Sequence, residues 1–267
     1  MLLVVDVGNT NTVLGALDGA TVLHRWRVST TPRTTDETSL LLLDLLRLRG
    51  LGAADIRGVV ISCVVPSVLY SLEKASRRIF DQEAMVVGPG LKTGLRVRTD
   101  NPREVGADRI VNCVAMLERR PGPFVVVDFG TATTFDCVDA RGDYIGGAIA
   151  PGFGISAEAL TSRTAKLPRV EVERPARAIG ANTVESMQSG LFWGYVGLVD
   201  GLARRCKDEL RARDHLPPDA PLTCIATGGL SNLLGRACET VDEVDDDLTL
   251  QGLRRLWELN APAPRRG

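Results

Sequence analysis

A short pattern of four apolar residues, an aspartate and a glycine-threonine turn occurs twice in this chain of 267 residues. In the first copy, Asp6 follows residues 2–5 and precedes the turn GNTNT. In the second copy, Asp128 follows residues 124–127 and precedes the turn GTATT. Each apolar run predicts a buried strand, and the residues after each turn predict a second strand. The repeat therefore predicts two related halves that begin in the same way.

The residue types in both turns suit a phosphate group. Glycine lets the backbone approach a phosphate closely, and hydroxyls and backbone N–H groups donate hydrogen bonds to it. Burying Asp6 or Asp128 at a strand end is costly unless a cation or hydrogen bonds stabilise the charge. A Gly-Asn turn is also typical of an ordinary β-hairpin. Its recurrence behind the same apolar and acidic residues favours two phosphate loops facing one nucleotide, with a divalent cation held opposite the phosphate.

The order of predicted elements indicates a duplicated α/β fold. The first half has strands over 2–5, 12–17, 21–28 and 58–65 and helices over 40–48 and 67–80. The second half has strands near 124–128, 133–138, 143–150 and 222–226 and helices near 153–163, 183–213 and 248–259. We expect two domains, 1–120 and 121–267, each a mixed five-stranded sheet flanked by helices. This arrangement resembles the actin-like (ribonuclease H-like) fold of the actin, Hsp70 and sugar-kinase superfamily.

A third segment, with the sequence NPREVGADRIVN, predicts a helix start. Asn101 suits the N-cap, Pro102 the first helical position and Glu104 the third residue after the cap. Asp108 would then lie about two turns into the helix, on a face that is not clearly solvated. By its spacing alone, Asp108 also fits an ion pair with Arg109 on the surface.

Two glycine-rich turns, at 146–152 and 227–229, are weak signals when taken alone. The second follows a predicted strand, and its position suits the space beneath an adenine or a ribose. A further segment, 180–186, opens the long predicted helix. The apolar residues of that helix recur at helical spacing and predict either core packing or a dimer interface.

The composition argues against several functions. A formal net charge of −1 with mixed charge signs disfavours a nucleic-acid-binding surface and favours a small-molecule ligand. The first apolar run ends at Asp6, too early for a signal peptide or a membrane span, so we expect a cytoplasmic protein. Six cysteines without a CxxC pair and two histidines offer little material for a zinc site or a histidine-based dyad.

Taken together, the motifs make the chain resemble the type III pantothenate kinases from residue 2 to about residue 260. The matching segments are DVGNT, EVGADR, DFGTATT, GAIAPG, GANT and TGG. The resemblance implies ATP-dependent phosphorylation of pantothenate to 4′-phosphopantothenate, the first step of coenzyme A biosynthesis. It also implies Mg²⁺ with ATP, a monovalent cation such as K⁺ or NH₄⁺, and a homodimer whose interface helps to form the pantothenate pocket.

The resemblance also implies a role for each matching residue. The nucleotide phosphate loop would comprise Asp6, Val7, Gly8, Asn9, Thr10, Asn11, Thr12 and Val13, with Asp6 near the divalent cation. The pantothenate contacts would be Gly106, Ala107, Asp108, Arg109 and Thr183. Asp128 would bind the monovalent cation, and Thr131 would contact ATP. Asp108 would be the general base, which replaces the interpretation of Asp108 as part of a surface pair.

These implied roles are chemically consistent. A carboxylate can orient and deprotonate the primary hydroxyl of pantothenate as the γ-phosphoryl group is transferred. The Arg109 guanidinium suits the carboxylate of pantothenate. A monovalent cation would offset the charge of ATP phosphates, because the phosphate loops contain no lysine.

One position departs from the family pattern, and two other functions remain open. Many relatives have a tyrosine where this chain has Thr99, which leaves a substrate contact at that position unassigned. A small-molecule kinase acting on a sugar would use the same fold. A transcription accessory protein without kinase activity is the non-enzymatic alternative, although the intact Asp6, Asp108 and Asp128 favour an active enzyme.

Overall fold

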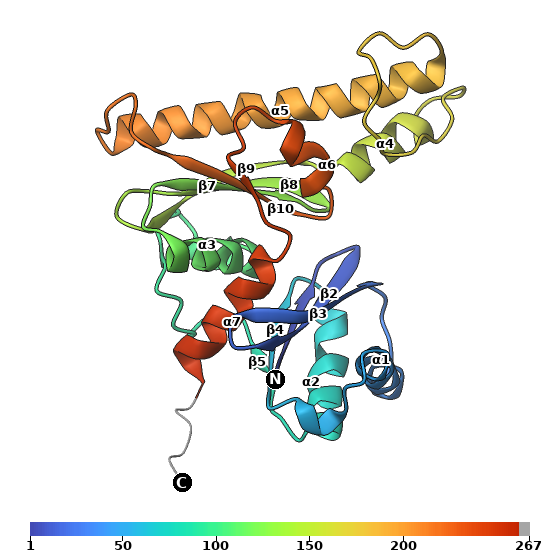
Figure 1. Cartoon of the computed structure of the whole chain (residues 1–267), viewed down its shortest axis with the longest axis vertical. Coiled ribbons are helices and arrows are strands. Elements are labelled where there is room, and N and C mark those ends of the chain that lie inside the picture. The colour runs from blue at the N-terminus through green and yellow to red at the C-terminus, as the bar shows by residue number, and fades with distance from the viewer. Residues whose placement is uncertain (262–267) are drawn as a thin grey trace. The chain divides into compact units, whose positions relative to one another are not determined.

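The computed structural model describes residues 1–261, and the chain forms two compact units (Figure 1). Unit 1 comprises Met1–Leu95, Asn101–Arg119 and the segment from Asp247 onward, and unit 2 comprises Arg96–Asp100 and Arg120–Asp246. The border after Arg119 lies next to the expected border between 1–120 and 121–267. The C-terminal segment, however, belongs to unit 1, although the sequence pattern assigns it to the second half. Helix packing, described below, explains this difference.

Unit 1 is built on a five-stranded mixed sheet in the order β3-β2-β1-β4-β5. Its strands are β1 (Leu2–Val7), β2 (Asn11–Asp18), β3 (Thr21–Ser29), β4 (Gly58–Cys63) and β5 (Met85–Val86). The central strand β1 pairs antiparallel with β2 and parallel with β4. The helices of this unit are α1 (Thr35–Arg47), α2 (Pro66–Phe80), α3 (Ala107–Arg119) and α7 (Leu248–Asn260), and short 3₁₀ turns cover Ala53–Asp55 and Pro102–Glu104.

Alternation along β1 sends its side chains to two different layers of unit 1. Val5 and Val7 pack with α1 and α2 in one core cluster. Val4 projects from the other face, where α7 packs, because a Cβ at Gly15 would contact both Val4 and Leu250. Asp6 follows the same alternation as Val4 and projects from the α7 side.

Helix α7 belongs to unit 1 because it closes this second face of the sheet. Gly58 of β4 has no Cβ, and the Trp257 ring of α7 occupies the space that a Cβ would take. Gly252 lies against the backbone of Val111, which brings α7 and α3 into close contact. Long-range packing of this kind is not encoded in the order of elements along the chain.

Unit 2 repeats the same strand order with one strand added. Its sheet runs β11-β10-β7-β8-β9-β6, so β9-β8-β7-β10-β11 corresponds to β3-β2-β1-β4-β5. The strands are β6 (Arg96–Val97), β7 (Phe124–Phe129), β8 (Ala132–Val138), β9 (Asp143–Pro151), β10 (Thr223–Gly228) and β11 (Glu243–Val244). The duplicated α/β fold is therefore confirmed. The expected five strands become six in unit 2, because β6 pairs with the edge strand β9.

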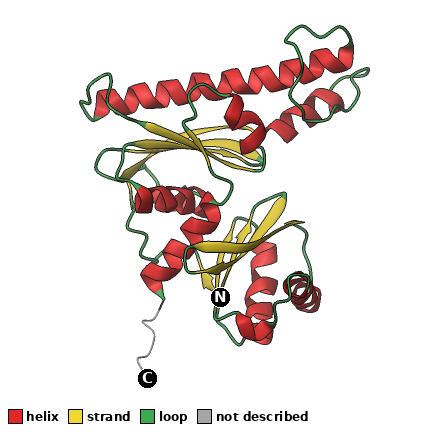
Figure 2. Cartoon of the chain, in the orientation of Figure 1, coloured by secondary structure: helices red, strands yellow, loops and turns green. Residues whose placement is uncertain are grey.

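Helix α5 (Thr183–Arg213) runs along one face of the second sheet, with α4 (Phe153–Ser162) beside its N-terminal part (Figure 2). Its apolar residues Phe192, Tyr195 and Val199 pack in the core with Val127 of β7, so the predicted apolar stripe is core packing. Short helical segments at Ser231–Leu234 (α6) and Gly235–Ala237 follow β10. Within the part of the chain that the structure describes, no helix has the length and apolar character of a membrane span.

Several helix boundaries match the sequence prediction, whereas the starts of α1 and α3 differ. The bounds of α5 agree with the predicted range 183–213, and α4 and α7 agree within one residue. Helix α1 begins at Thr35, earlier than the predicted 40–48, because Thr34 and Glu37 form a capping box. Glu37 is thus part of the first helical turn.

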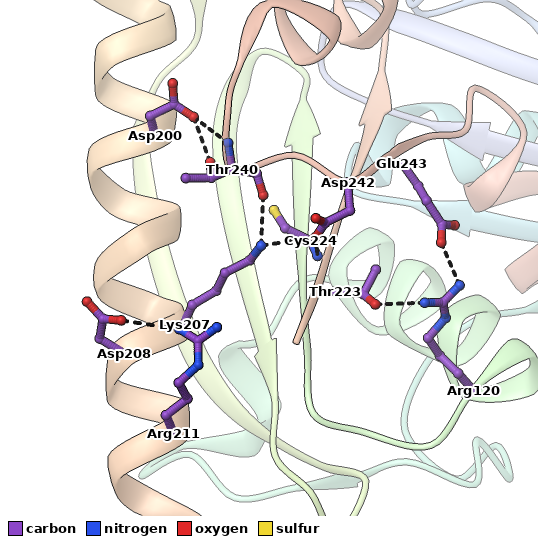
Figure 3. Close-up of polar contacts among 10 residues, drawn as sticks. All are labelled: Arg120, Asp200, Lys207, Asp208, Arg211, Thr223, Cys224, Thr240, Asp242 and Glu243. Carbon is purple, nitrogen blue, oxygen red and sulfur yellow. Dashed lines mark hydrogen bonds and ion pairs between the residues drawn. The ribbon is translucent and has the colours of Figure 1, made fainter. Parts of the chain in front are cut away.

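Polar contacts hold strand β10 in place within unit 2 (Figure 3). Lys207 of α5 lies 3.0 Å from the Asp242 carboxylate, which accepts the Cys224 backbone N–H at 2.7 Å. At the start of the strand, the Arg120 guanidinium donates to the Thr223 hydroxyl at 2.7 Å. These contacts fix the position of the strand whose last residues belong to the TGG motif.

Candidate nucleotide and substrate site

The first candidate phosphate loop is an exposed turn between β1 and β2. The Gly8 N–H donates to the Asn11 carbonyl at 3.0 Å, and the Thr10 carbonyl accepts the Thr30 N–H at 2.9 Å. Asn9, Thr10 and Asn11 are exposed. This turn has a defined shape and presents polar groups to solvent, as a phosphate-binding loop requires.

The residues that flank this turn are held by the protein itself. Val7 is buried in the core cluster of unit 1. Thr12 is buried, and its hydroxyl lies 2.9 Å from that of Thr30. Val13 is half-buried within β2. Within the predicted range 6–13, Val7 and Thr12 therefore support the turn, and Gly8 to Asn11 form the surface that a ligand can reach.

The second candidate loop is one residue shorter than the first. Phe129 pairs with Thr133 across three residues, whereas Val7 pairs with Thr12 across four. The Gly130 N–H donates to the Ala132 carbonyl at 3.0 Å. Thr131, the expected ATP contact, lies in this turn and is half-buried.

Both weak glycine motifs of the sequence contact this second site. The Gly152 N–H donates to the Thr131 carbonyl at 3.0 Å, and a Cβ at Gly152 would overlap that carbonyl. Gly228 has φ +92°, and a Cβ there would overlap the Asp128 carboxylate. Sequence spacing cannot reveal these close approaches, because they depend on atoms of residues that are far apart in the chain.

Asp6 and Asp128 occupy equivalent positions in the two units. Each lies near the C-terminal end of a central strand, is half-buried and has further contacts within the protein. Burial raises the pKa of the Cys63 thiol, and the negative charge of Asp6 contributes in the same direction. The Asp6 carboxylate therefore lies near the end of β4, where Cys63 pairs with Val7.

The Asp108 segment differs from its predicted structure. Asn101 does not cap an α-helix: Pro102–Glu104 forms a single 3₁₀ turn, and α3 begins at Ala107. Val105 has an extended conformation, which interrupts the helix after Glu104. Asp108 consequently lies in the first turn of α3, not two turns into a helix.

This position suits a reactive carboxylate. The N-terminal turn of a helix exposes backbone N–H groups, which can donate hydrogen bonds to a carboxylate or an anionic ligand. The Arg109 N–H donates to Oδ1 of Asp108 at 2.9 Å. A Cβ at Gly106 would lie 2.5 Å from the same oxygen, so glycine leaves room for this rotamer. Ala107, Asp108 and Arg109 are all half-buried.

Thr183 is the first residue of α5 and lines an open cavity of about 540 Å³ in unit 2. The cavity is lined by Leu160, Leu167, Thr183, Ser186, Met187, Gly190 and Leu191. Asn182 caps the helix by accepting the Glu185 N–H at 2.9 Å. Glu185 in turn accepts the Ala181 N–H at 2.9 Å, which, with a hydrogen bond from Arg177, lowers the pKa of its carboxyl.

The remaining position that the sequence singles out, Thr99, lies in unit 2. Its hydroxyl is buried and has no hydrogen-bond partner among residues 1–261. A Cβ at Gly146 would lie 3.9 Å from its methyl group. The predicted site residues thus fall into two groups: the first loop and the Asp108 segment in unit 1, and the second loop, Thr99 and Thr183 in unit 2.

Comparison with protein families and comparison with curated sequences point to the same family. Residues 2–205 match the family model described as type III pantothenate kinase. The type III pantothenate kinase of Geobacter sulfurreducens is 54% identical over 261 residues, covering 97% of this chain and 99% of that protein. That of Halalkalibacterium halodurans is 48% identical over 261 residues, covering 97% and 100%.

Comparison with solved structures shows the same fold at low sequence identity. A conserved Campylobacter jejuni protein assigned to the Baf family of transcriptional activators matches with a TM-score of 0.59 and 18% identity, covering 96% of this chain and 97% of that chain. The ethanolamine utilization protein EutJ of Carboxydothermus hydrogenoformans matches with a TM-score of 0.53 and 11% identity, covering 95% and 89%.

Proposed function

This chain belongs to the type III pantothenate kinase family, and from that premise we propose how its residues carry out the reaction. The enzyme phosphorylates pantothenate to 4′-phosphopantothenate, the first step of coenzyme A biosynthesis, with ATP as phosphoryl donor and an alcohol group as acceptor. The single observation that carries this function is a sequence identity of 52% and 54% to two type III pantothenate kinases over 97% of the chain. The use of ATP supports a cytoplasmic location.

Asp6 and the first loop form the proposed site for the ATP phosphates and Mg²⁺. The exposed turn from Gly8 to Asn11 offers backbone N–H groups and polar side chains to phosphate oxygens. The Asp6 carboxylate supplies the oxygen ligand that Mg²⁺ prefers, so the donor set fits this ion. When bound, Mg²⁺ neutralises charge on the phosphate oxygens during transfer.

Asp108 is the proposed general base. Its Oδ1 atom already accepts the Arg109 N–H, which leaves Oδ2 to accept the proton of the pantothenate primary hydroxyl. The hydroxyl oxygen then bonds to the γ-phosphorus as the bond to the β-phosphate oxygen breaks, and ADP leaves. Arg109 pairs with the pantothenate carboxylate, and Gly106 and Ala107 provide close backbone approach.

Asp128 is the proposed ligand of the monovalent cation, and Thr131 contacts ATP. A half-buried carboxylate at a strand end is a suitable oxygen donor for K⁺ or NH₄⁺. The second loop contains no lysine that could offset the charge of the ATP phosphates. A monovalent cation bound there would supply this positive charge. Potassium-dependent turnover is the direct consequence of this assignment.

We also propose a homodimer that uses the region around Thr183. Ile155 on α4, Val184 on α5 and Ile179, which precedes α5, are 46%, 42% and 85% exposed. Exposed apolar side chains beside a partly apolar cavity favour an interaction surface. A second copy covering this surface would enclose the cavity that Thr183 lines. Size-exclusion chromatography with light scattering tests the dimer, and a strict monomer would contradict it.

The function is tested by ADP release from purified protein with ATP, magnesium and a panel of acceptors that includes pantothenate and sugars. Pantothenate-dependent turnover that requires potassium or ammonium would support the substrate and the Asp128 assignment together. Turnover with a sugar but not with pantothenate would leave the fold assignment unchanged and would show that the substrate is a sugar. Absence of turnover, together with DNA binding at physiological salt, would favour the transcription accessory alternative.

A further inference from the structure

A buried threonine hydroxyl lies beside the proposed cation-binding carboxylate of unit 2. Thr227 of β10 pairs with Asp128 of β7 across two parallel strands. Paired residues of parallel strands project from the same face of a sheet. Val127 and Phe129, the neighbours of Asp128 in sequence, pack in the α5 core on the opposite face. The Thr227 and Asp128 side chains therefore share the face that points away from α5.

The Thr227 hydroxyl makes no hydrogen bond within the described part of the chain. Thr227 is 1% exposed, and its Oγ1 atom has no hydrogen-bond partner among residues 1–261. A buried hydroxyl without a partner destabilises the fold, and an apolar side chain of the same shape would avoid this cost. A ligand that bonds to the hydroxyl oxygen explains why a polar residue occupies this position.

The same pair of groups occurs in unit 1, where Ser62 of β4 pairs with Asp6 of β1. Ser62 is fully buried, and its Oγ atom also lacks a hydrogen-bond partner within the described chain. Val5 and Val7 pack with α1 and α2 on the opposite face. A buried hydroxyl without a partner thus lies beside the strand-end aspartate in both units. This recurrence indicates that the hydroxyl acts together with the aspartate.

The adjacent carboxylate indicates which kind of ligand the Thr227 hydroxyl takes. Neighbouring strands lie about 4.8 Å apart, so oxygens on paired side chains can approach one ion together. The carboxylate of Asp128 repels an anionic phosphate and attracts a cation. Gly228 lets this carboxylate lie against the end of β10, directly after Thr227, because it has no Cβ.

We propose that the Thr227 hydroxyl oxygen is a second ligand, together with the Asp128 carboxylate, for the monovalent cation of unit 2. This inference rests on the proposed assignment of that cation to Asp128. Thr227 binds the cation and takes no part in proton transfer. Its loss should therefore change potassium binding more than it changes the folded structure.

The test uses the full chain with Thr227→Val, Thr227→Ser and Asp128→Asn. Two quantities are measured in potassium or sodium chloride at equal ionic strength: the melting temperature during cation titration, and Mg-ATP affinity by calorimetry. In the absence of potassium, the melting temperature of Thr227→Val should be no lower than that of wild type, because the substitution removes an unpaired buried hydroxyl. Its half-saturating potassium concentration should rise about tenfold or more, because the loss of even an outer-shell partner weakens a metal site by about tenfold. Thr227→Ser should bind potassium like wild type.

Thr223→Val is the matched control on the same strand. It removes the hydroxyl that accepts a hydrogen bond from Arg120, so it should lower the melting temperature and leave the potassium response unchanged. If wild type shows no potassium response, the cation assignment fails and this inference fails with it. If Asp128→Asn loses the response while Thr227→Val keeps it, the inference alone is overturned. Equal loss of ATP affinity in both salts would assign the hydroxyl to the nucleotide and also overturn it.

Discussion

Single atoms decide what the candidate site residues can do. Asp108 lies in the first turn of α3, and one of its carboxylate oxygens is held by the Arg109 N–H. Gly106 provides the space for this oxygen. An oriented carboxylate follows from these local features, and a carboxylate within hydrogen-bond reach of an alcohol is suited to remove its proton.

Asp108→Asn should therefore leave the fold and Mg-ATP affinity intact and reduce turnover by about 100-fold or more, the effect of losing a general base. Steady-state kinetics with pantothenate and calorimetric titration with ATP measure the two quantities. Asp100→Asn, which changes an exposed aspartate in unit 2, is the control and should behave like wild type. Undiminished turnover in Asp108→Asn would remove Asp108 from the mechanism.

Gly152 and Gly154 differ in the space around their α-carbons. A Cβ at Gly152 would overlap the Thr131 carbonyl, so Gly152→Ala should displace the second loop, lower the melting temperature and weaken ATP binding. A Cβ at Gly154, within α4, would meet no atom within 4 Å. Gly154→Ala should stabilise the protein by up to about 1 kcal/mol because alanine favours helix. Equal ATP affinity in the two variants would contradict the role of Gly152.

At the scale of elements, helix starts depend on side chains that cap them. Asn182 and Glu185 satisfy backbone N–H groups at the start of α5, and the observed start agrees with the predicted one. Asn101 and Glu104 show the same spacing, yet they produce only a 3₁₀ turn before α3. A capping pattern therefore predicts where a helical turn begins, whereas the residues after it decide whether the turn continues.

Glu185 makes the start of α5 sensitive to acid. Its pKa lies below the ordinary value of 4.5, first because the Ala181 N–H donates to it and then because Arg177 does. A lowered folded-state pKa gives stability that is present above pH 4.5 and is lost as the pH falls through the folded value. The melting temperature of wild type should exceed that of Glu185→Gln at pH 7, and this difference should narrow as the pH falls below 4.5. Thermal unfolding at pH 7 and at a series of pH values below 4.5 checks this, and a constant difference would contradict it.

At the scale of the whole molecule, the chain returns to unit 1 at its C-terminal end. Helix α7 places Trp257 over Gly58 and Gly252 against Val111. Arg254 adds hydrogen bonds to Glu118 and Glu258. The contacts of α7 with Gly58, Val111 and Glu118 make unit 1 depend on residues that are far away in sequence.

A chain ending at residue 246 should therefore lose the cooperative unfolding of unit 1, because it exposes the apolar face that α7 covers. Hydrogen exchange and thermal unfolding would show early opening of β1 and β4. A chain ending at residue 261 retains all of α7 and is the matched control. If β1 of the shorter chain were protected from hydrogen exchange as strongly as in wild type, α7 would not be required for the stability of unit 1.

Local chemistry alone determined much of this protein. Apolar runs form strands by burial, glycine and threonine form turns, and the repeat of both reveals two related halves. The positions of Asp6, Asp128 and the two loops follow from these short-range rules. The six motifs, read together, also indicated the family.

Which distant residues meet depends on the tertiary structure. The pairing of Thr227 with Asp128, the contact of Gly152 with Thr131 and the return of α7 to unit 1 all join segments far apart in the chain. Residue spacing cannot predict such contacts, because each depends on how strands pair and on whether a backbone position leaves room for another atom.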